Sequence, residues 1–176
     1  SMDFGSYLEA TGSGSFTVSK DYLAGPFMSD FSSWGVLPNL TLSPDITAHG
    51  GEILSAVVGG DDYDTLSGTS MACPNLAGAL VLVRQYVKNF DKNYTTQQVR
   101  DISYSRMMST ATIVHNEEGN PYSPRKQGAG IADMMHAVNS KAYLTVDGSN
   151  KPKLSLGDDP SRSGVYTMTF NVVNSS

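Results

Sequence analysis

The sequence predicts a chain of mixed α/β character, because a strand-like run precedes two helix-like segments and an alternating segment follows them. Residues 52–58 (EILSAVV) are apolar and β-branched, and Gly59 and Gly60 end the run, as is typical of a short strand. Residues 68–87 carry small and aliphatic side chains nearly all round a helical wheel, which predicts a buried helix. Residues 165–173 (VYTMTFNVV) alternate with a period of two, as strands do.

Local signals predict the remaining elements. Residues 15–19 (SFTVS) resemble a strand, and the proline- and glycine-rich residues 30–51 predict loops. Pro74 is expected near the start of the first helix, where a missing N–H has little effect. Thr95 followed by Gln98 predicts a capping box that opens a second helix ending near residue 107. Residues 115–130 predict another loop and residues 131–139 a short helix.

The pattern changes after residue 140, which divides the chain into residues 1–140 and 141–176. The second part contains two alternating runs, 142–146 and 165–173, separated by the turn-rich residues 157–164. Two or three strands are too few for a stable sandwich on their own. Residues 141–176 are therefore expected to be the start of a second, all-β domain.

Composition excludes several functional classes. The 176 residues include 12 Lys+Arg and 17 Asp+Glu, so a net charge of −5 gives no support for binding nucleic acid. No run approaches the roughly 18 apolar residues that a transmembrane helix needs, and the first residues do not resemble a signal peptide. Cys73 is the single cysteine and cannot form an internal disulfide.

The segment most informative about chemistry is residues 66–78, LSGTSMACPNLAG. A serine at the N-terminus of a helix lies beside unpaired N–H groups and a dipole that favours negative charge. An oxyanion forming at Ser70 could be stabilised by the Ser70 N–H, and Gly68 would let a substrate backbone approach closely. A Gly-Thr-Ser sequence alone is more simply explained by Thr69 or Ser70 acting as a helix N-cap.

The longer motif resembles the serine segment of the subtilase family, peptidase family S8. FSSWG at 31–35, PDITA at 44–48 and QGAGI at 127–131 resemble other subtilase segments in the same order. The pattern is most similar to the cell-envelope group of lactocepins and C5a peptidases. The resemblance implies that residues 1–140 are the C-terminal half of a three-layer α/β/α domain with a mostly parallel sheet. Residues 141–176 would begin a fibronectin type III-like β-sandwich.

By the same resemblance, the parent protein is a serine endopeptidase that hydrolyses peptide bonds through an acyl-enzyme on Ser70. The Ser70 N–H would be one oxyanion donor, and Gly68 and Thr69 would lie beside the substrate. The family's triad Asp and His and its oxyanion Asn precede the serine, so they are expected outside this chain, and the chain alone is expected to be inactive. The resemblance requires no metal or organic cofactor. A structural calcium ion would be compatible with it, although the sequence gives no evidence for one.

The other polar candidates have simpler explanations. His49, His115 and His136 lack a Gly-rich His-Gly-Thr context and are expected to be exposed or locally bonded. Asp45 is expected to bond nearby backbone N–H groups. The acidic residues Asp61, Asp62 and Asp64 form a solvated loop or, alternatively, a surface that prefers basic substrates. Cys73 is expected to pack as a buried small residue.

Alternative interpretations remain open at this point. The chain could pair with a separate N-terminal half, or self-associate through the surface that this half would cover. The parent could also be a catalytically dead subtilase retained as a protein-binding module. Protein or peptide substrates and an extracellular, cell-wall location follow from the family resemblance alone.

Overall fold

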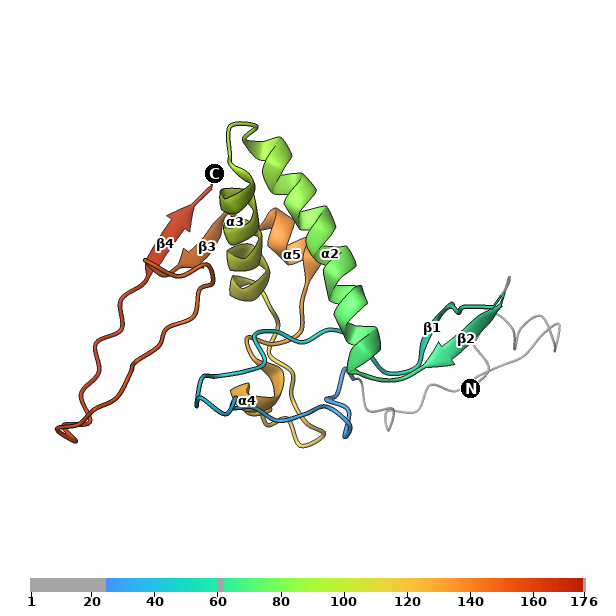
Figure 1. Ribbon diagram of the computed structural model, residues 1–176, viewed down its shortest axis with the longest axis horizontal. Coiled ribbons are helices and arrows are strands. Elements are labelled where there is room, and N and C mark those ends of the chain that lie inside the picture. The colour runs from blue at the N-terminus through green and yellow to red at the C-terminus, as the bar shows by residue number, and fades with distance from the viewer. Residues whose placement is uncertain (1–24, 60–61, 176) are drawn as a thin grey trace.

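The computed structural model describes residues 25–59 and 62–175 of the chain (Figure 1). The strand predicted at 15–19 and the residue Asp61 lie outside this part. The described elements, in chain order, are β1 (Ile53–Ala56), β2 (Tyr63–Leu66), α2 (Thr69–Phe90), α3 (Thr96–Ser109), α4 (Pro124–Gln127), α5 (Met134–Asn139), β3 (Ala142–Thr145) and β4 (Asn171–Asn174).

Three helices enclose the hydrophobic core. In Figure 1, α5 lies between α2 and α3, and each of the three contacts the other two. The side chains buried among them are Val83, Val87, Val99, Met107 and Ala137. None of the helices in the described part of the chain is long and apolar enough to cross a membrane.

Helix α2 forms where the sequence predicts a helix, but the prediction that it is buried is wrong. Only Val83 and Val87 are buried in it, whereas Val81 and Leu82 are 62% and 51% exposed. The reason is that α3 and α5 cover one stripe of the helix and no other described helix packs on it. Burial on several faces would require partners beyond these elements.

Pro74 lies near the start of α2, as expected, but as the sixth residue it is inside the helix, where the missing N–H does remove a hydrogen bond. A proline has no N–H, so the Ser70 carbonyl cannot accept the usual hydrogen bond from the residue four positions later. The helix is therefore weakened within its first two turns.

The capping box that opens α3 is confirmed. The Gln98 N–H donates to Thr95 Oγ1 over 3.2 Å, and the Thr95 N–H donates to Gln98 Oε1 over 2.9 Å. The helix ends at Ser109, two residues beyond the predicted end.

The loop predicted at 115–130 contains a short helix, α4. The Ser123 side chain accepts a hydrogen bond from the Arg125 N–H, and Pro124 occupies the first helical position. Both features favour a helix start. Helix α5 begins at Met134, not at residue 131, because Ile131 is hydrogen-bonded as a strand residue and Asp133 caps the helix.

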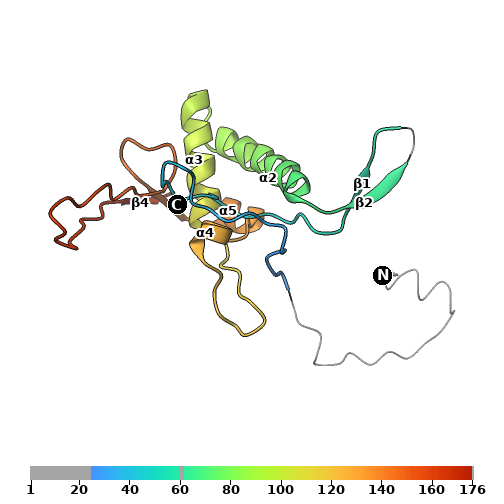
Figure 2. The same ribbon diagram turned by 60° about the horizontal axis from the view of Figure 1, so that its bottom comes forward.

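Both sheets are antiparallel pairs. β1 pairs with β2 in a hairpin that extends away from the helices in Figures 1 and 2, and β3 pairs with β4. The strand predicted over 165–173 is observed only at 171–174. Among the described residues, parallel pairing is limited to one bridge between Thr47 and Ile131. Helices and sheets are both present, while the mostly parallel sheet and the β-sandwich remain predictions.

Arg106 ties the β3–β4 pair to the helices. Its side chain is buried, and its Nη1 donates to the carbonyl oxygens of Ala137 and Ser140 over 3.0 and 2.9 Å. Its Nη2 donates to Ser175 Oγ over 2.6 Å. The guanidinium also lies 5.5 and 5.1 Å from the ring centroids of Tyr86 and Tyr143. One buried cation thus connects α2, α3, the end of α5, β3 and the residue that follows β4.

We expect Arg106→Ala to lower the free energy of unfolding by about 3 kcal/mol, because three charge-assisted hydrogen bonds and two ring contacts are lost. Urea denaturation of the chain would measure the change. Arg100→Ala is the matched control on the same helix, and its partly exposed pair with the adjacent Asp101 predicts a loss below about 1 kcal/mol. Equal losses from the two variants would contradict the anchoring role of Arg106.

Candidate functional site at the start of α2

Gly68, not a hydroxyl residue, caps the N-terminus of α2. Its backbone is extended, and no side chain caps this end of the helix. The alternative that Thr69 or Ser70 is the N-cap is therefore wrong. Both residues lie in the first helical turn and are exposed, and the Ser70 hydroxyl makes no hydrogen bond with any described residue.

The start of α2 rests directly on Gly50. The Gly68 N–H donates to the Gly50 carbonyl over 2.7 Å, and the Gly68 carbonyl accepts from the N–H groups of Met71 and Ala72. A side chain at position 50 would place its Cβ 2.6 Å from the Gly68 carbonyl oxygen and 2.9 Å from Ala72 Cβ. Glycine at position 50 therefore permits the close approach that fixes where the helix begins.

Residues 127–132 hold the segment 45–50 that carries Gly50. The Thr47 N–H donates to the Gly130 carbonyl and the Ala132 N–H to the Thr47 carbonyl, both over 2.8 Å. Thr47 Oγ1 also donates to the Gln127 carbonyl over 3.0 Å. The QGAGI motif therefore acts as a backbone support for the segment that precedes α2.

The same residues bind a second segment, 112–114. Ile131 and Thr112 exchange two backbone hydrogen bonds of 2.8 and 2.9 Å. The buried Gln127 amide accepts from the Val114 N–H over 2.7 Å and donates to the Tyr122 carbonyl over 2.6 Å. Three chain segments thus meet beneath the start of α2.

Gly128 and Gly130 are required by this arrangement. Their φ angles are +63° and +120°, where side chains are strained. A Cβ on Gly128 would lie 2.4 Å from the Asp45 carbonyl carbon, and one on Gly130 would lie 2.3 Å from the Thr112 carbonyl oxygen. A side chain at position 128 would push the backbone away from Asp45, and one at position 130 would push it away from Thr112.

We expect Gly130→Ala to reduce the free energy of unfolding by about 3 kcal/mol or more, because strain and a backbone clash add. Gly119→Ala is the control, since Gly119 has a φ of +81° but open space around its Cβ position, which predicts a loss of about 1 kcal/mol. Chemical denaturation of both variants checks this, and a Gly130→Ala chain as stable as the control would refute the close contact.

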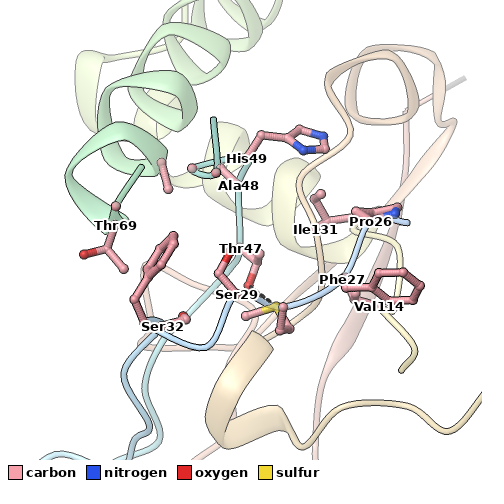
Figure 3. Close-up of a pocket in the computed structure, with 16 residues that line it drawn as sticks. Pro26, Phe27, Ser29, Ser32, Thr47, Ala48, His49, Thr69, Val114 and Ile131 are labelled. Carbon is pink, nitrogen blue, oxygen red and sulfur yellow. Dashed lines mark hydrogen bonds between the residues drawn. The ribbon is translucent and has the colours of Figure 1, made fainter. Parts of the chain in front are cut away.

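A cavity of about 210 Å³ lies beside the helix start. Figure 3 shows Thr69 and Ser32 on one side, Thr47 and Ser29 between, and His49 and Ile131 on the other side. Gly68 and Thr69 line this cavity but Ser70 does not. The structure thus places two of the three predicted site residues against a cavity lined by apolar and hydroxyl groups, with Ser70 adjacent to them in the chain.

The three histidines agree with the expectation that they are exposed or locally bonded. His49 is exposed and lines the cavity, and His115 is exposed in a loop. His136 Nδ1 lies 3.1 Å from Asp133 Oδ2 on α5. None of them hydrogen-bonds to Ser70, so the described part of the chain brings no base to the predicted nucleophile.

Two expectations for single residues are wrong. The Asp45 carboxylate does not bond nearby backbone but binds Lys151 and Lys153, more than 100 residues later in the chain. Cys73 is exposed, not buried, because it lies on the face of α2 that α3 and α5 leave uncovered. Asp62 and Asp64 are exposed as expected, but Asp64 lies in strand β2 and not in a loop. The described residues contain no cluster of three or more His, Cys, Asp or Glu suited to a metal ion.

The pKa of Asp45 is lowered from its ordinary value. Partial burial opposes ionisation, but the hydrogen bonds and positive charges of Lys151 and Lys153 outweigh it. A carboxylate whose pKa is lower in the folded than in the unfolded chain adds stability above its unfolded pKa. That stability is lost as the pH falls through the folded pKa.

We therefore expect the melting temperature of the chain to fall as the pH is lowered below about 4. Asp45→Asn should melt lower than the wild type at pH 6 and lose less on acidification. Part of the acid sensitivity should remain, because hydrogen bonds, first from the Gly164 N–H, lower the pKa of Asp159 to about 2.

Thermal melts between pH 6 and pH 2 would measure how much the melting temperature of the wild type and of Asp45→Asn falls on acidification. Asp101→Asn is the matched control, since the Asp101 carboxylate binds only neighbours on the same helix. If the melting temperature of Asp45→Asn depended on pH as it does in the wild type, the stabilising role of the ionised Asp45 carboxylate would be contradicted.

Comparison with known proteins identifies the family. Residues 14–130 match the Subtilase family. The C5a peptidase of Streptococcus pyogenes serotype M6 is 34% identical over 154 residues, which cover 87% of this chain and 13% of that protein. The PII-type proteinase of Lactococcus lactis subsp. cremoris is 36% identical over 155 residues, covering 81% of this chain and 8% of that protein.

The chain thus spans a small part of the length of these relatives. The match to the C5a peptidase is longer than the 140 residues before the predicted boundary, so it includes part of residues 141–176. Both relatives are named as peptidases or proteinases, in agreement with the resemblance of the serine, PDITA and QGAGI segments. The chain belongs to the subtilase family and is similar to its C5a-peptidase and lactococcal proteinase members.

Proposed function

We propose that this chain supplies the nucleophile of a serine endopeptidase, with Ser70 as the attacking residue. One observation carries the proposal. Ser70 is exposed at the N-terminus of a 22-residue helix, and its hydroxyl does not cap that helix. A cap serine would have its oxygen committed to a backbone N–H. The Ser70 oxygen is available for attack.

In the proposed reaction, Ser70 Oγ attacks the carbonyl carbon of a peptide bond and loses its proton to a histidine. The tetrahedral intermediate collapses to an ester on Ser70 as the amine leaves with that proton, and water then hydrolyses the ester. The histidine and the aspartate that orients it would come from outside this chain. No metal or organic cofactor is needed for these steps.

The geometry at the start of α2 supports a role in binding the oxyanion. The Ser70 N–H is in the first turn, where a helix has no internal acceptor for it, and the helix dipole favours negative charge there. Gly68 and Thr69 would lie beside the scissile residue, since both line the adjacent cavity. The second oxyanion donor would be an asparagine outside the chain.

The proposal extends to the architecture. Residues 1–140 would be the C-terminal half of a three-layer domain with a mostly parallel sheet, and residues 141–176 the start of a fibronectin type III-like domain. The neighbouring apolar side chains Val81 and Leu82 on α2, which are 62% and 51% exposed, support association with the other half or with a second copy. We place the parent outside the cell or in its envelope on family resemblance alone.

The experiment is labelling with a fluorophosphonate probe, which reacts with activated serines. We expect the full-length parent to label at Ser70, and its Ser70→Ala form and the isolated chain not to label. Ser67→Ala in the parent is the matched control, because Ser67 is a nearby serine whose oxygen already accepts the Glu52 N–H, and it should still label.

Two other outcomes would change the proposal. If the isolated chain labels at Ser70, a base is present within it, and His49 would be the first to test. If the parent does not label, the protein is a dead subtilase that acts as a binding module.

A further inference from the structure

Two lysines of the segment after residue 140 hold one carboxylate of the segment before Ser70. Lys153 Nζ lies 2.8 Å from Asp45 Oδ1, and Lys151 Nζ binds Asp45 Oδ2. Lys153 also donates to the Leu42 carbonyl. These side chains are between 28% and 35% exposed, so the contact is partly shielded from solvent. We call these three residues the Asp45 clamp.

The clamp lies against α2, about two to three turns after the start of the helix. A cavity of about 310 Å³ is lined by Asp45, Ile46 and Lys151 together with Leu76 and Leu80 of α2. Ile46 also packs on the hydrophobic core. The aliphatic stem of Lys151 therefore shares a surface with the helix that carries Ser70, as long lysine stems do on apolar surfaces.

The backbone connects the clamp with the nucleophile. Gly50 is five positions after Asp45, a distance of roughly 16 Å in an extended chain. The hydrogen bonds of Thr47 to residues 130 and 132 fix the middle of that stretch, and Gly50 accepts the bond from Gly68 that sets the start of α2. Asp45 and Gly50 are thus the two ends of one stretch of backbone that is held at Asp45, at Thr47 and at Gly50, and removing the clamp would loosen the first of these attachments.

The segment after residue 140 is attached at a second place as well. Arg106 binds the Ser140 carbonyl at its beginning and Ser175 Oγ at its end. The clamp at 151 and 153 is a separate contact in the middle of the segment. The segment is thus attached at Ser140, at Ser175 and at the clamp. Because both of its ends are bound to Arg106, the segment can restrain the position of Asp45.

We propose that the Asp45 clamp is a positioning device, through which the segment after residue 140 holds the start of α2 in the geometry that Ser70 needs. This inference rests on the proposed function of Ser70. Asp45, Lys151 and Lys153 touch no substrate in this proposal and act only through the backbone of residues 45–50.

The first test uses the full-length parent and the rate constant of fluorophosphonate labelling at Ser70. We expect Asp45→Asn, and separately Lys151→Met with Lys153→Met, to slow labelling about tenfold, because small displacements of a reacting group are costly. The final extent of labelling should be unchanged, and kcat for peptide hydrolysis should fall with KM unaltered. Loss of folded protein alone would instead lower the final extent.

A double-mutant cycle identifies the pair as the cause. All three substitutions together should slow labelling no more than either set alone, because the same contact is removed. Methionine keeps the lysine stem and removes only the ammonium group. Asp101→Asn is the control and should label at the wild-type rate. Wild-type rates in the clamp variants, or additive effects, would overturn the proposal.

The second test does not depend on activity. In this chain, hydrogen exchange of the amides of residues 71–73, 75 and 76 should be faster in Asp45→Asn than in the wild type or Asp101→Asn. If the parent fails to label, the proposed function of Ser70 is wrong, but hydrogen exchange still tests whether the clamp stabilises the start of α2. Unchanged exchange at the start of α2 would overturn it.

Discussion

Residues 127–132 hydrogen-bond to two other segments at once, 45–47 on one side and 112–114 on the other. This arrangement is the constraint on which the candidate site depends, because Gly50 continues directly from the first segment and holds the start of α2. Backbone groups make most of these bonds, so the contact is sensitive to main-chain shape. Glycines at 128 and 130 are the residues that let three chain segments approach so closely.

Local signals in the sequence predicted local structure well. The capping box at Thr95 and Gln98 is present as expected, since both partners lie within one helical turn. The serine motif correctly predicted a helix starting next to Ser70, although Gly68 is the cap. Helix α4 was missed, yet Ser123 followed by Pro124 was a usable signal of a helix start.

Features that depend on distant partners could not be predicted. The apolar residues of α2 indicated burial, but burial is decided by which elements cover a face, and α3 and α5 cover only one. The partners of Asp45 lie 106 and 108 residues away, so no window around PDITA contains them. The same holds for Arg106, a charged residue whose burial follows from acceptors at 137, 140 and 175.

The start of α2 is intrinsically weak, and this links the fold to the proposed chemistry. A glycine cap leaves the Ser70 hydroxyl free but gives the helix no side-chain hydrogen bond. Pro74 removes the donor that would reach the Ser70 carbonyl, and a proline inside a helix costs about 3 kcal/mol. A helix start with these two features needs support from outside itself to hold one position. Gly50 supplies a direct bond, and the segment that carries Gly50 is in turn fixed by residues 127–132 and by the ion pairs of Asp45. The position of Ser70 at the start of α2 therefore depends on tertiary contacts, and substitutions distant from Ser70 in sequence can alter it.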